Sequence, residues 1–259
     1  MSSDTPLPHV MVAPNGARLT KADHPALPIT LAELITTALT CRADGADGIH
    51  LHLRDKDGGH LLDAGAYREA VAQFATELPG FPVQITTEAV GQYDPDHQRQ
   101  IALNSGTTLV SASVRELRRD SLSTTRDFYE ECAARGIALQ HILYDVEDAD
   151  LLVKSLPEHM FGDEELQLLF VLGRYSADQN ADPAALDRFL AWMARHAIKP
   201  DWAVCAFGQN ETPSLLRAAR NGGKCRIGFE NSRQHADGRV ARDNAERVRE
   251  LVLALSQQR

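Results

Sequence analysis

Cysteine is scarce in this chain of 259 residues. The four cysteines, Cys41, Cys132, Cys205 and Cys225, are widely scattered, and no two of them form a CxxC pair. This spacing argues against a disulfide framework and against a zinc knot built from thiolates. We therefore expect reduced thiols with structural roles.

Long apolar runs and an excess of positive charge are also missing. No uninterrupted apolar stretch is long enough to span a bilayer, and residues 1–16 show no basic region followed by an apolar one. We expect a cytoplasmic protein without a membrane partner. The net charge of -9 argues against nucleic acid as a partner, because phosphate contacts need a basic surface.

No low-complexity tract or Pro/Ser-rich linker divides the chain, so we expect residues 1–259 to form a single domain. Short apolar runs alternate regularly with longer amphipathic ones, which is typical of strands and helices in turn. The strand-like runs are residues 9–16, 48–55, 82–90, 107–113, 138–145, 166–173, 202–208 and 225–231. The helix-like runs are residues 31–46, 66–78, 94–104, 124–136, 146–156, 182–197, 212–223 and 243–255.

Several helix-like runs begin with a recognised signal. Thr30 and Glu33 have the spacing of a capping box, and Asp94 and Asp182 are each followed by a proline, as an N-cap residue often is. Repeated strand-then-helix units over about 250 residues match a (β/α)8 barrel. A doubly wound sheet usually has a glycine-rich phosphate turn after its first strand, whereas the turn here reads APNGAR. We predict a (β/α)8 TIM barrel.

The stretch GIHLHLRDKDG places two imidazoles in an apolar strand. Side chains alternate across a strand, so His50 and His52 share a face, with Arg54 on the same face if the strand continues. A bare HxH is more often a pair of satisfied core histidines. In a closed barrel, however, strand eight lies one strand away from strand two, so Glu230 can reach these histidines. Two histidines and a carboxylate are typical of catalytic zinc, although manganese, iron and cobalt accept the same ligands. We predict a metal site at these three residues.

Other polar side chains cluster at the ends of the predicted strands, where barrel active sites are built. The candidates for substrate binding are Asn15, Arg54, Thr86, Thr87, Ser111 and Ser113. Glu88 is a candidate general base, with a salt bridge to a neighbouring arginine as the alternative. Arg226 either pairs with Glu230 or clamps a carboxylate or enolate, and Gly228 between them would leave room for a ligand.

A further likeness spans essentially the whole chain. It is carried by APNGAR, HLHLRDKDG, QITTEAVG, LVSAS followed by VREL, FVLG, WAVCAFG, and RIGFEN followed by ADGRVARDNAE. The pattern HxHxRDxDG is fairly specific in combination with RxGxE. Together these segments resemble the β-keto acid cleavage enzyme family, which includes 3-keto-5-aminohexanoate cleavage enzyme.

The resemblance implies a zinc-containing (β/α)8 barrel that forms a homo-oligomer, either a dimer or a tetramer. It implies an acyltransferase that converts a β-keto acid and acetyl-CoA into acetoacetate and a new acyl-CoA. In that chemistry the metal at His50, His52 and Glu230 is a Lewis acid on the keto oxygen. Thr86 and the serines of strand four would hold the substrate carboxylate, and Arg226 would support the charged intermediates.

One position departs from the family pattern. Strand eight of the family ends in GxED, where the aspartate is the catalytic base, and this chain has Asn231 there. An amide is not a base at neutral pH. Either Asn231 orients substrate or water while Glu88 or another carboxylate takes the proton, or the chain catalyses a variant reaction. The turn APNGAR also lacks an acidic side chain to contact an amine, so we do not expect the aminohexanoate to be the substrate of this chain. The alternatives are another metal-dependent barrel hydrolase or aldolase, and a catalytically impaired metal-binding homologue.

Overall fold

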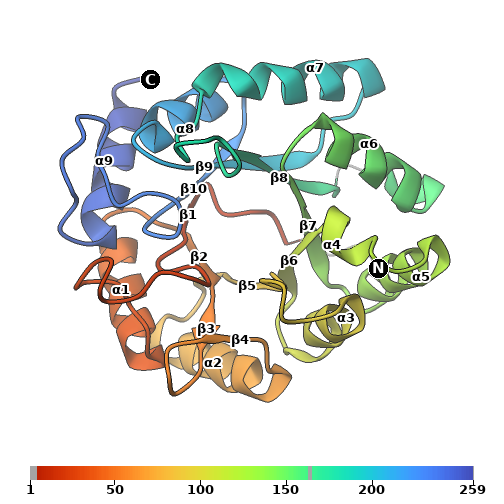
Figure 1. Cartoon of the computed structure of the whole chain (residues 1–259), viewed down its shortest axis with the longest axis horizontal. Coiled ribbons are helices and arrows are strands. Elements are labelled where there is room, and N and C mark those ends of the chain that lie inside the picture. Colours follow the sequence, from red (N-terminus) through yellow and green to blue (C-terminus); the bar gives the residue numbers. More distant parts are fainter. Residues whose placement is uncertain (1–4, 163–164, 259) are drawn as a thin grey trace.

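Parallel strands close into a barrel at the centre of the molecule (Figure 1). The computed structural model describes residues 5–162 and 165–258, and eight strands of this part of the chain form the barrel. In chain order they are β1 (Val10–Val12), β2 (Gly48–Leu51), β5 (Val83–Thr86), β6 (Leu109–Ser113), β7 (Ala138–Leu143), β8 (Gln167–Leu172), β9 (Asp201–Ala206) and β10 (Lys224–Ile227). The barrel closes through β1, where Met11 lies opposite Gly48 of β2 and Arg226 of β10. The predicted (β/α)8 barrel is confirmed.

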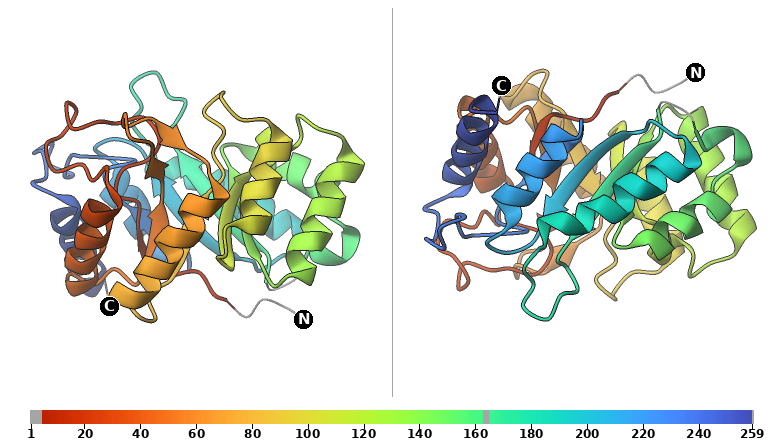
Figure 2. Two further views of the ribbon diagram at one scale, coloured as in Figure 1. Left: turned by 90° about the horizontal axis from the view of Figure 1, so that it is seen from below. Right: turned by 90° about the horizontal axis from the view of Figure 1, so that it is seen from above.

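Helices surround the strands on the outside (Figure 2). Within the described residues they are α1 (Leu31–Ala43), α2 (Ala64–Glu77), α3 (Pro95–Asn104), α4 (Val114–Leu117), α5 (Leu122–Ala134), α6 (Val146–Ser155), α7 (Leu186–His196), α8 (Glu211–Arg220) and α9 (Asn244–Ser256), with 3-10 turns η1 (Glu158–Met160) and η2 (Pro183–Ala185). None of the helices in this part of the chain is both long and apolar enough to cross a membrane.

The predicted helix starts are built as their sequence signals indicate. Thr30 and Glu33 form a complete capping box before α1, with the backbone N–H of Thr30 donating to Glu33 Oε2 at 3.0 Å. Asp94 accepts a hydrogen bond from the backbone N–H of His97 at 2.8 Å. Asp182 caps the 3-10 turn η2, which leads into α7. These side chains satisfy N–H groups that the first helical turn leaves without a partner.

Apolar side chains pack in two layers, one between strands and helices and one inside the barrel. Alternation along β8 separates them: Leu168 and Phe170 belong to the outer layer, and Leu169 and Val171 to the inner one. The inner cluster consists of Leu7, Met11, Leu109, Ala138, Ile142, Leu169, Val171, Ala203 and Cys205. All four cysteines are buried and free, as expected.

The strand predicted over residues 48–55 is interrupted in the structure. β2 ends at Leu51, and after His52 the chain forms a short antiparallel hairpin of β3 (Leu53–Arg54) and β4 (His60–Leu61). The carboxylate of Asp55 closes the hairpin turn by accepting from the backbone N–H groups of Asp57 and Gly59. The hairpin therefore turns the chain away from the barrel wall immediately after the two histidines.

Candidate active site

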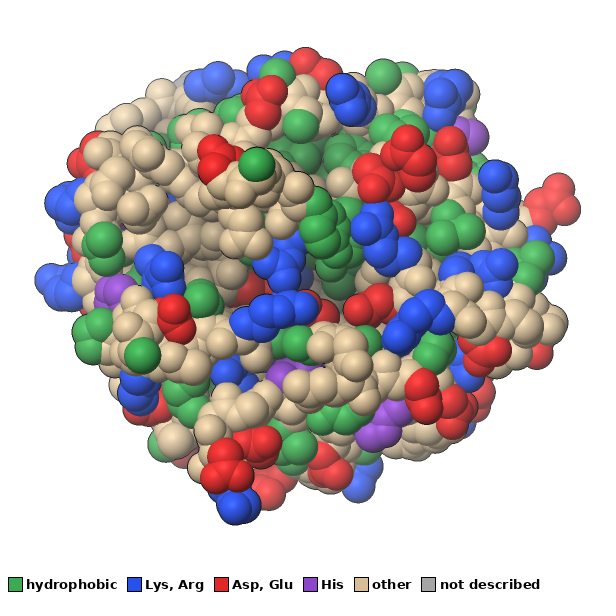
Figure 3. All heavy atoms as spheres, in the orientation of Figure 1, with side chains coloured by type: hydrophobic (Ala, Val, Ile, Leu, Met, Phe, Trp, Pro, Cys, Tyr) green, Lys and Arg blue, Asp and Glu red, His purple; other side chains and the backbone are tan. Residues whose placement is uncertain are grey.

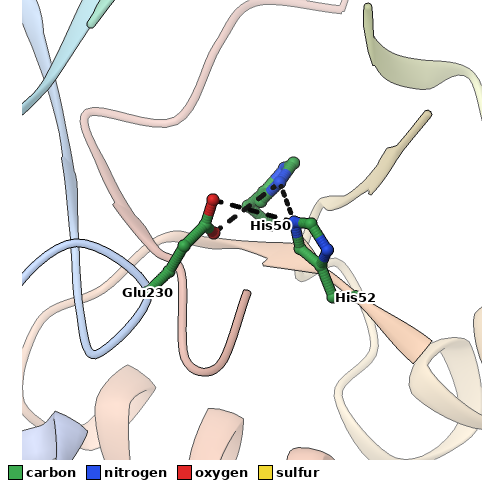
Figure 4. Close-up of side chains that lie close together, drawn as sticks. All are labelled: His50, His52 and Glu230. Carbon is green, nitrogen blue, oxygen red and sulfur yellow. Dashed lines mark hydrogen bonds and ion pairs between the residues drawn. The ribbon is translucent and has the colours of Figure 1, made fainter. Parts of the chain in front are cut away.

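Two imidazoles and a carboxylate meet at one end of the barrel (Figure 4). His50 lies on β2, His52 follows it, and Glu230 lies in the turn after β10. The two Nε2 atoms are 3.1 Å apart, and the Glu230 oxygens lie 3.8 Å from His50 Nε2 and 3.7 Å from His52 Nε2. One ligand atom from each of the three residues lies within 4.8 Å of the other two. The structure thus brings together the three residues predicted as metal ligands.

A chain of buried amides sets the tautomer of His50. Gln140 Nε2 donates to the backbone carbonyl of Leu168 at 3.2 Å, so its Oε1 is free to accept from Gln84 Nε2 at 2.9 Å. Gln84 Oε1 then accepts from His50 Nδ1–H at 2.8 Å. His50 therefore carries its proton on Nδ1 and presents the lone pair of Nε2 to the cluster, as metal-bound histidines commonly do.

A third histidine stands beside His52. The Nε2–H of His60 donates to the backbone carbonyl of Glu88 at 2.8 Å, which leaves His60 Nδ1 as an acceptor. The rings of His52 and His60 are 5.4 Å apart between centroids. Within the described residues, the Nδ1 atoms of both rings are buried and have no hydrogen-bond partner.

The carboxylate of Glu230 is held by Arg226. Arg226 Nη2 donates to Glu230 Oε1 at 2.7 Å, so the ion pair considered from the sequence is formed. Across the described chain, the Nε and Nη1 groups of this buried guanidinium and Oε2 of Glu230 have no partner. Gly16 has a φ of 60°, and a Cβ there would lie 2.7 Å from Glu230 Cγ, so the close approach requires glycine.

Buried groups beneath the site hold the turn that carries Glu230. The backbone N–H of Gly228 donates to Glu211 Oε1 at 3.1 Å, and Glu211 Oε2 accepts from the fully buried Arg247 at 2.7 Å. Burial raises the pKa of Glu211 to about 7, against the opposing charge of Arg247. A Cβ on Gly228 would lie 2.4 Å from the carbonyl oxygen of Ala13. The space predicted at Gly228 is thus taken by the backbone of Ala13, which follows β1, and not by a ligand.

Electrostatics keep both histidines neutral. Burial is the largest cause that lowers the pKa of His50 and of His52 well below the usual range, and the charge of Arg226 adds to it. Burial alone would lower the pKa of Arg226, but the charge of Glu230 helps to hold it above its usual value. Two neutral imidazole nitrogens and an anionic oxygen are the donors that a divalent transition metal prefers, so the residues fit a metal ion.

A cavity of about 520 Å³ opens above this cluster. Figure 3 shows the hollow on this face of the molecule, bordered by cationic, acidic and hydrophobic side chains. Its wall on β7, β8 and β9 is largely apolar and includes Ile142, Val171, Cys205 and Phe207. The cavity is therefore polar around the histidines, whereas the opposite side combines these apolar side chains with Tyr144 and Arg174.

Among the predicted substrate-binding residues, Asn15 and Thr86 line the cavity. Asn15 Nδ2 donates to the carbonyl of His52 at 3.1 Å, and its Oδ1 is buried without a partner in the described structure. The Thr86 hydroxyl oxygen accepts from the backbone N–H of Glu88 at 2.9 Å, so its own proton is available to a ligand. Both residues are placed to orient a polar substrate.

Four other predicted substrate-binding residues are not among those that line this cavity in the described chain: Thr87, Ser111, Ser113 and Arg54. The Thr87 hydroxyl donates to the carbonyl of Ser111 at 2.9 Å. Ser113 is buried at the start of α4. Arg54 donates to the backbone carbonyls of Gly16, Leu19 and Gly58, because the hairpin turns it toward the loop after β1.

Glu88, the candidate general base, and Asn231, which stands in place of the family's aspartate, both line the cavity. Glu88 Oε1 accepts from Arg18 Nη1 at 2.8 Å, so the salt bridge considered as the alternative role is present. The Glu88 charge still acts on the site, since it tends to raise the pKa of His52. Asn231 is buried, and neither atom of its amide group has a partner within the described residues.

Sequence reasoning missed three residues around the cluster: Gln84 and Gln140, which orient His50, and His60, which lies beside His52. Gln84 had a usable signal, because alternation places it on the same strand face as Thr86 and Glu88. Gln140 likewise interrupts an apolar strand. His60 had none, since its place depends on a hairpin that the sequence pattern did not indicate.

Comparison with known proteins adds to this geometry. The sequence model of the beta-keto acid cleavage enzyme family matches residues 9–258. A 3-keto-5-aminohexanoate cleavage enzyme of Fusobacterium nucleatum is 26% identical over 246 residues, which cover 92% of this chain and 87% of the relative. A 3,5-dioxohexanoate:acetyl-CoA acetone transferase of Paraburkholderia graminis is 24% identical over an alignment of 278 residues, which covers 93% of this chain and 87% of the relative.

Solved structures also resemble this chain. A binary complex of ObcA with oxaloacetate superposes with a TM-score of 0.69 at 16% identity and covers 92% of this chain. The matched part spans 65% of the ObcA chain. At this identity the likeness shows the barrel fold alone.

Proposed function

Since this chain belongs to the beta-keto acid cleavage enzyme family, whose model matches residues 9–258, we propose that it transfers acyl groups between a β-keto acid and acetyl-CoA. The bond between C2 and C3 of the keto acid breaks, and the two-carbon carboxylate fragment takes the acetyl group to form acetoacetate. The remaining acyl group leaves on CoA. The name of the Paraburkholderia relative, which includes acetyl-CoA, supports this co-substrate.

The observation that carries the proposal is a set of buried polar atoms that belong to cavity-lining residues and have no hydrogen-bond partner in the described structure. They are two N–H groups of Arg226, Oε2 of Glu230, the amide of Asn231 and Oδ1 of Asn15. Buried donors and acceptors are costly when unpaired, so a polar ligand is their natural partner. A β-keto acid offers a carboxylate and a keto oxygen, which accept from the N–H groups of Arg226 and Asn231, and the Glu230 oxygen is left for a metal ion.

Each residue has a defined task in this scheme. A zinc ion held by His50, His52 and Glu230 would supply Lewis acidity at the keto oxygen of the substrate. Arg226 donates its free N–H groups to the anionic intermediates, and the Thr86 hydroxyl donates to the substrate carboxylate. Glu88 removes and returns the proton at C2, and Asn231 orients the substrate or a water molecule.

The proposed reaction is tested by incubating the purified protein with acetyl-CoA and a panel of β-keto acids. We expect acetoacetate and the new acyl-CoA to form in equal amounts, with loss of turnover after chelation and recovery on adding Zn²⁺. Acetoacetate is measured by a coupled dehydrogenase and acyl-CoA by mass spectrometry. Cleavage of the keto acid without consumption of acetyl-CoA would indicate a hydrolase or aldolase, and would contradict the proposal.

We expect His60→Ala to lower the affinity for Zn²⁺ by about ten- to hundred-fold, as loss of a histidine's outer partner typically does. If His52 gives Nε2 to the metal, its proton would stay on Nδ1, and a water molecule between the two rings, whose centroids are 5.4 Å apart, would connect it to the free Nδ1 of His60. Competition with a chromophoric chelator measures the affinity. His60→Gln keeps a donor for the Glu88 carbonyl and an acceptor for His52, so it is expected to restore much of the loss. Unchanged affinity in His60→Ala would rule out this role.

A further inference from the structure

Three of the four arginines that line the cavity are neutralised by an acid that lines it as well. The pairs are Arg18 with Glu88 at 2.8 Å, Arg226 with Glu230 at 2.7 Å and Arg233 with Asp23 at 3.7 Å. Arg174 is the fourth arginine. Over residues 5–162 and 165–258, its guanidinium forms neither an ion pair nor a hydrogen bond. An unpaired cation in a binding cavity favours an anionic ligand.

Arg174 is positioned by the apolar wall of the cavity. It lies two residues after the end of β8, and its guanidinium carbon is 5.2 Å from the ring centre of Phe207. Burial raises the pKa of the Cys205 thiol to about 12, and the charges of Arg226 and Arg174 both oppose that rise. Arg174, Cys205 and Arg226 line the same cavity, so the Arg174 guanidinium borders the space in which the substrate would react.

The barrel places Arg174 across the cavity from the histidines. β8, which leads to Arg174, lies opposite β2, which carries His50. Three strands separate them in either direction around the barrel: β7, β6 and β5 on one side, and β9, β10 and β1 on the other. The apolar side chains of Ile142, Val171 and Cys205 line the cavity in the same region. A substrate with its keto group at the histidines would extend along this wall, and its far end would meet Arg174.

We propose that Arg174 binds a second carboxylate, so that the preferred substrate is a β-keto diacid with an aliphatic spacer. The inference rests on the proposed function. The phosphates of CoA are the other anions available, but the pantetheine arm separates them from the thioester by many bonds. Arg174 lines the same cavity as the proposed metal ligands, which favours an anion on the reacting substrate over those phosphates. One further acid of the cavity, the exposed Asp178, accepts only from the backbone N–H of Asn180 in the described structure.

The test compares Arg174→Met with the wild-type protein on two substrates of equal length, 3-oxohexanedioate and 3-oxohexanoate. Methionine keeps the contact with Phe207 and removes the charge. We expect kcat/KM for the diacid to fall about ten- to hundred-fold, mostly through KM, the range typical of a lost charged hydrogen bond. The change for the monoacid should stay below about three-fold, and the KM for acetyl-CoA should not change.

Arg233→Met is the matched control, because Arg233 lines the same cavity but is already paired with Asp23. It should affect both substrates equally. Equal losses on both substrates in Arg174→Met, a wild-type preference for the monoacid, or a raised KM for acetyl-CoA would each overturn the inference. A protein that turns over no keto acid would refute the proposed function instead. In that case calorimetry with hexanedioate still decides the role of Arg174: weaker binding to Arg174→Met supports it, and equal binding refutes it.

Discussion

Replacing both His50 and His52 with alanine is expected to remove most of the bound metal and to lower turnover by roughly a thousand-fold. The two imidazoles supply the neutral nitrogen donors of the cluster, and Glu230 alone is already engaged with Arg226. Elemental analysis of protein purified without an affinity tag measures the metal, and the acetyl-CoA assay measures turnover. Each single replacement should have the same direction of effect.

Helical structure should survive these replacements, because neither histidine belongs to the apolar layers of the barrel. His24→Ala is a matched control: His24 is buried and lines the same cavity, but its Nε2 bonds to the carbonyl of Ala241 at 2.9 Å. Its metal content should be normal. A normal metal content in the His50→Ala, His52→Ala double variant would refute the proposed metal site.

We expect Glu88→Gln to reduce turnover by about a hundred-fold or more while leaving the metal content unchanged. Glutamine keeps the shape of the side chain and an oxygen that accepts from Arg18, but it removes the basicity that proton transfer needs. Steady-state kinetics on the best keto acid, with metal analysis of the same preparation, measure both effects. Near-native turnover of Glu88→Gln would refute the role of Glu88 as the base, and would mean that another residue, water or the substrate itself transfers the proton.

Replacements of Asn231 complete this test. The side-chain amide of Asn231 forms no hydrogen bond within the described residues. Asn231→Ala should therefore lower turnover only by what one orienting hydrogen bond to substrate contributes, on the order of ten-fold. Asn231→Asp places a titratable group in the same cavity as Arg226 and should raise turnover or shift its pH profile. A hundred-fold loss in Asn231→Ala would mean that the amide, and not Glu88, dominates catalysis.

The fold was predictable because each barrel strand is buried on both faces and each helix on one. The run predicted over residues 166–173 becomes β8 (Gln167–Leu172), and the run over residues 146–156 becomes α6 (Val146–Ser155). Such periodic patterns are local, and their order along the chain identifies the barrel. The hairpin of β3 and β4 was not predicted, because two-residue strands show no periodicity.

The sequence by itself determined the barrel, because strand-like and helix-like runs alternate along the chain, and it grouped His50 with His52, because residues two apart on a strand share a face. Barrel closure then placed Glu230 within reach. Only the tertiary structure decided which polar groups face the cavity. Thr87 and Arg54 bond to backbone carbonyls, whereas Arg226 and Asn231 keep free polar atoms there. The hydrogen-bond partner of a polar atom depends on residues that folding brings close. A strand pattern predicts the direction of a side chain only while the strand stays regular, and β2 ends at Leu51.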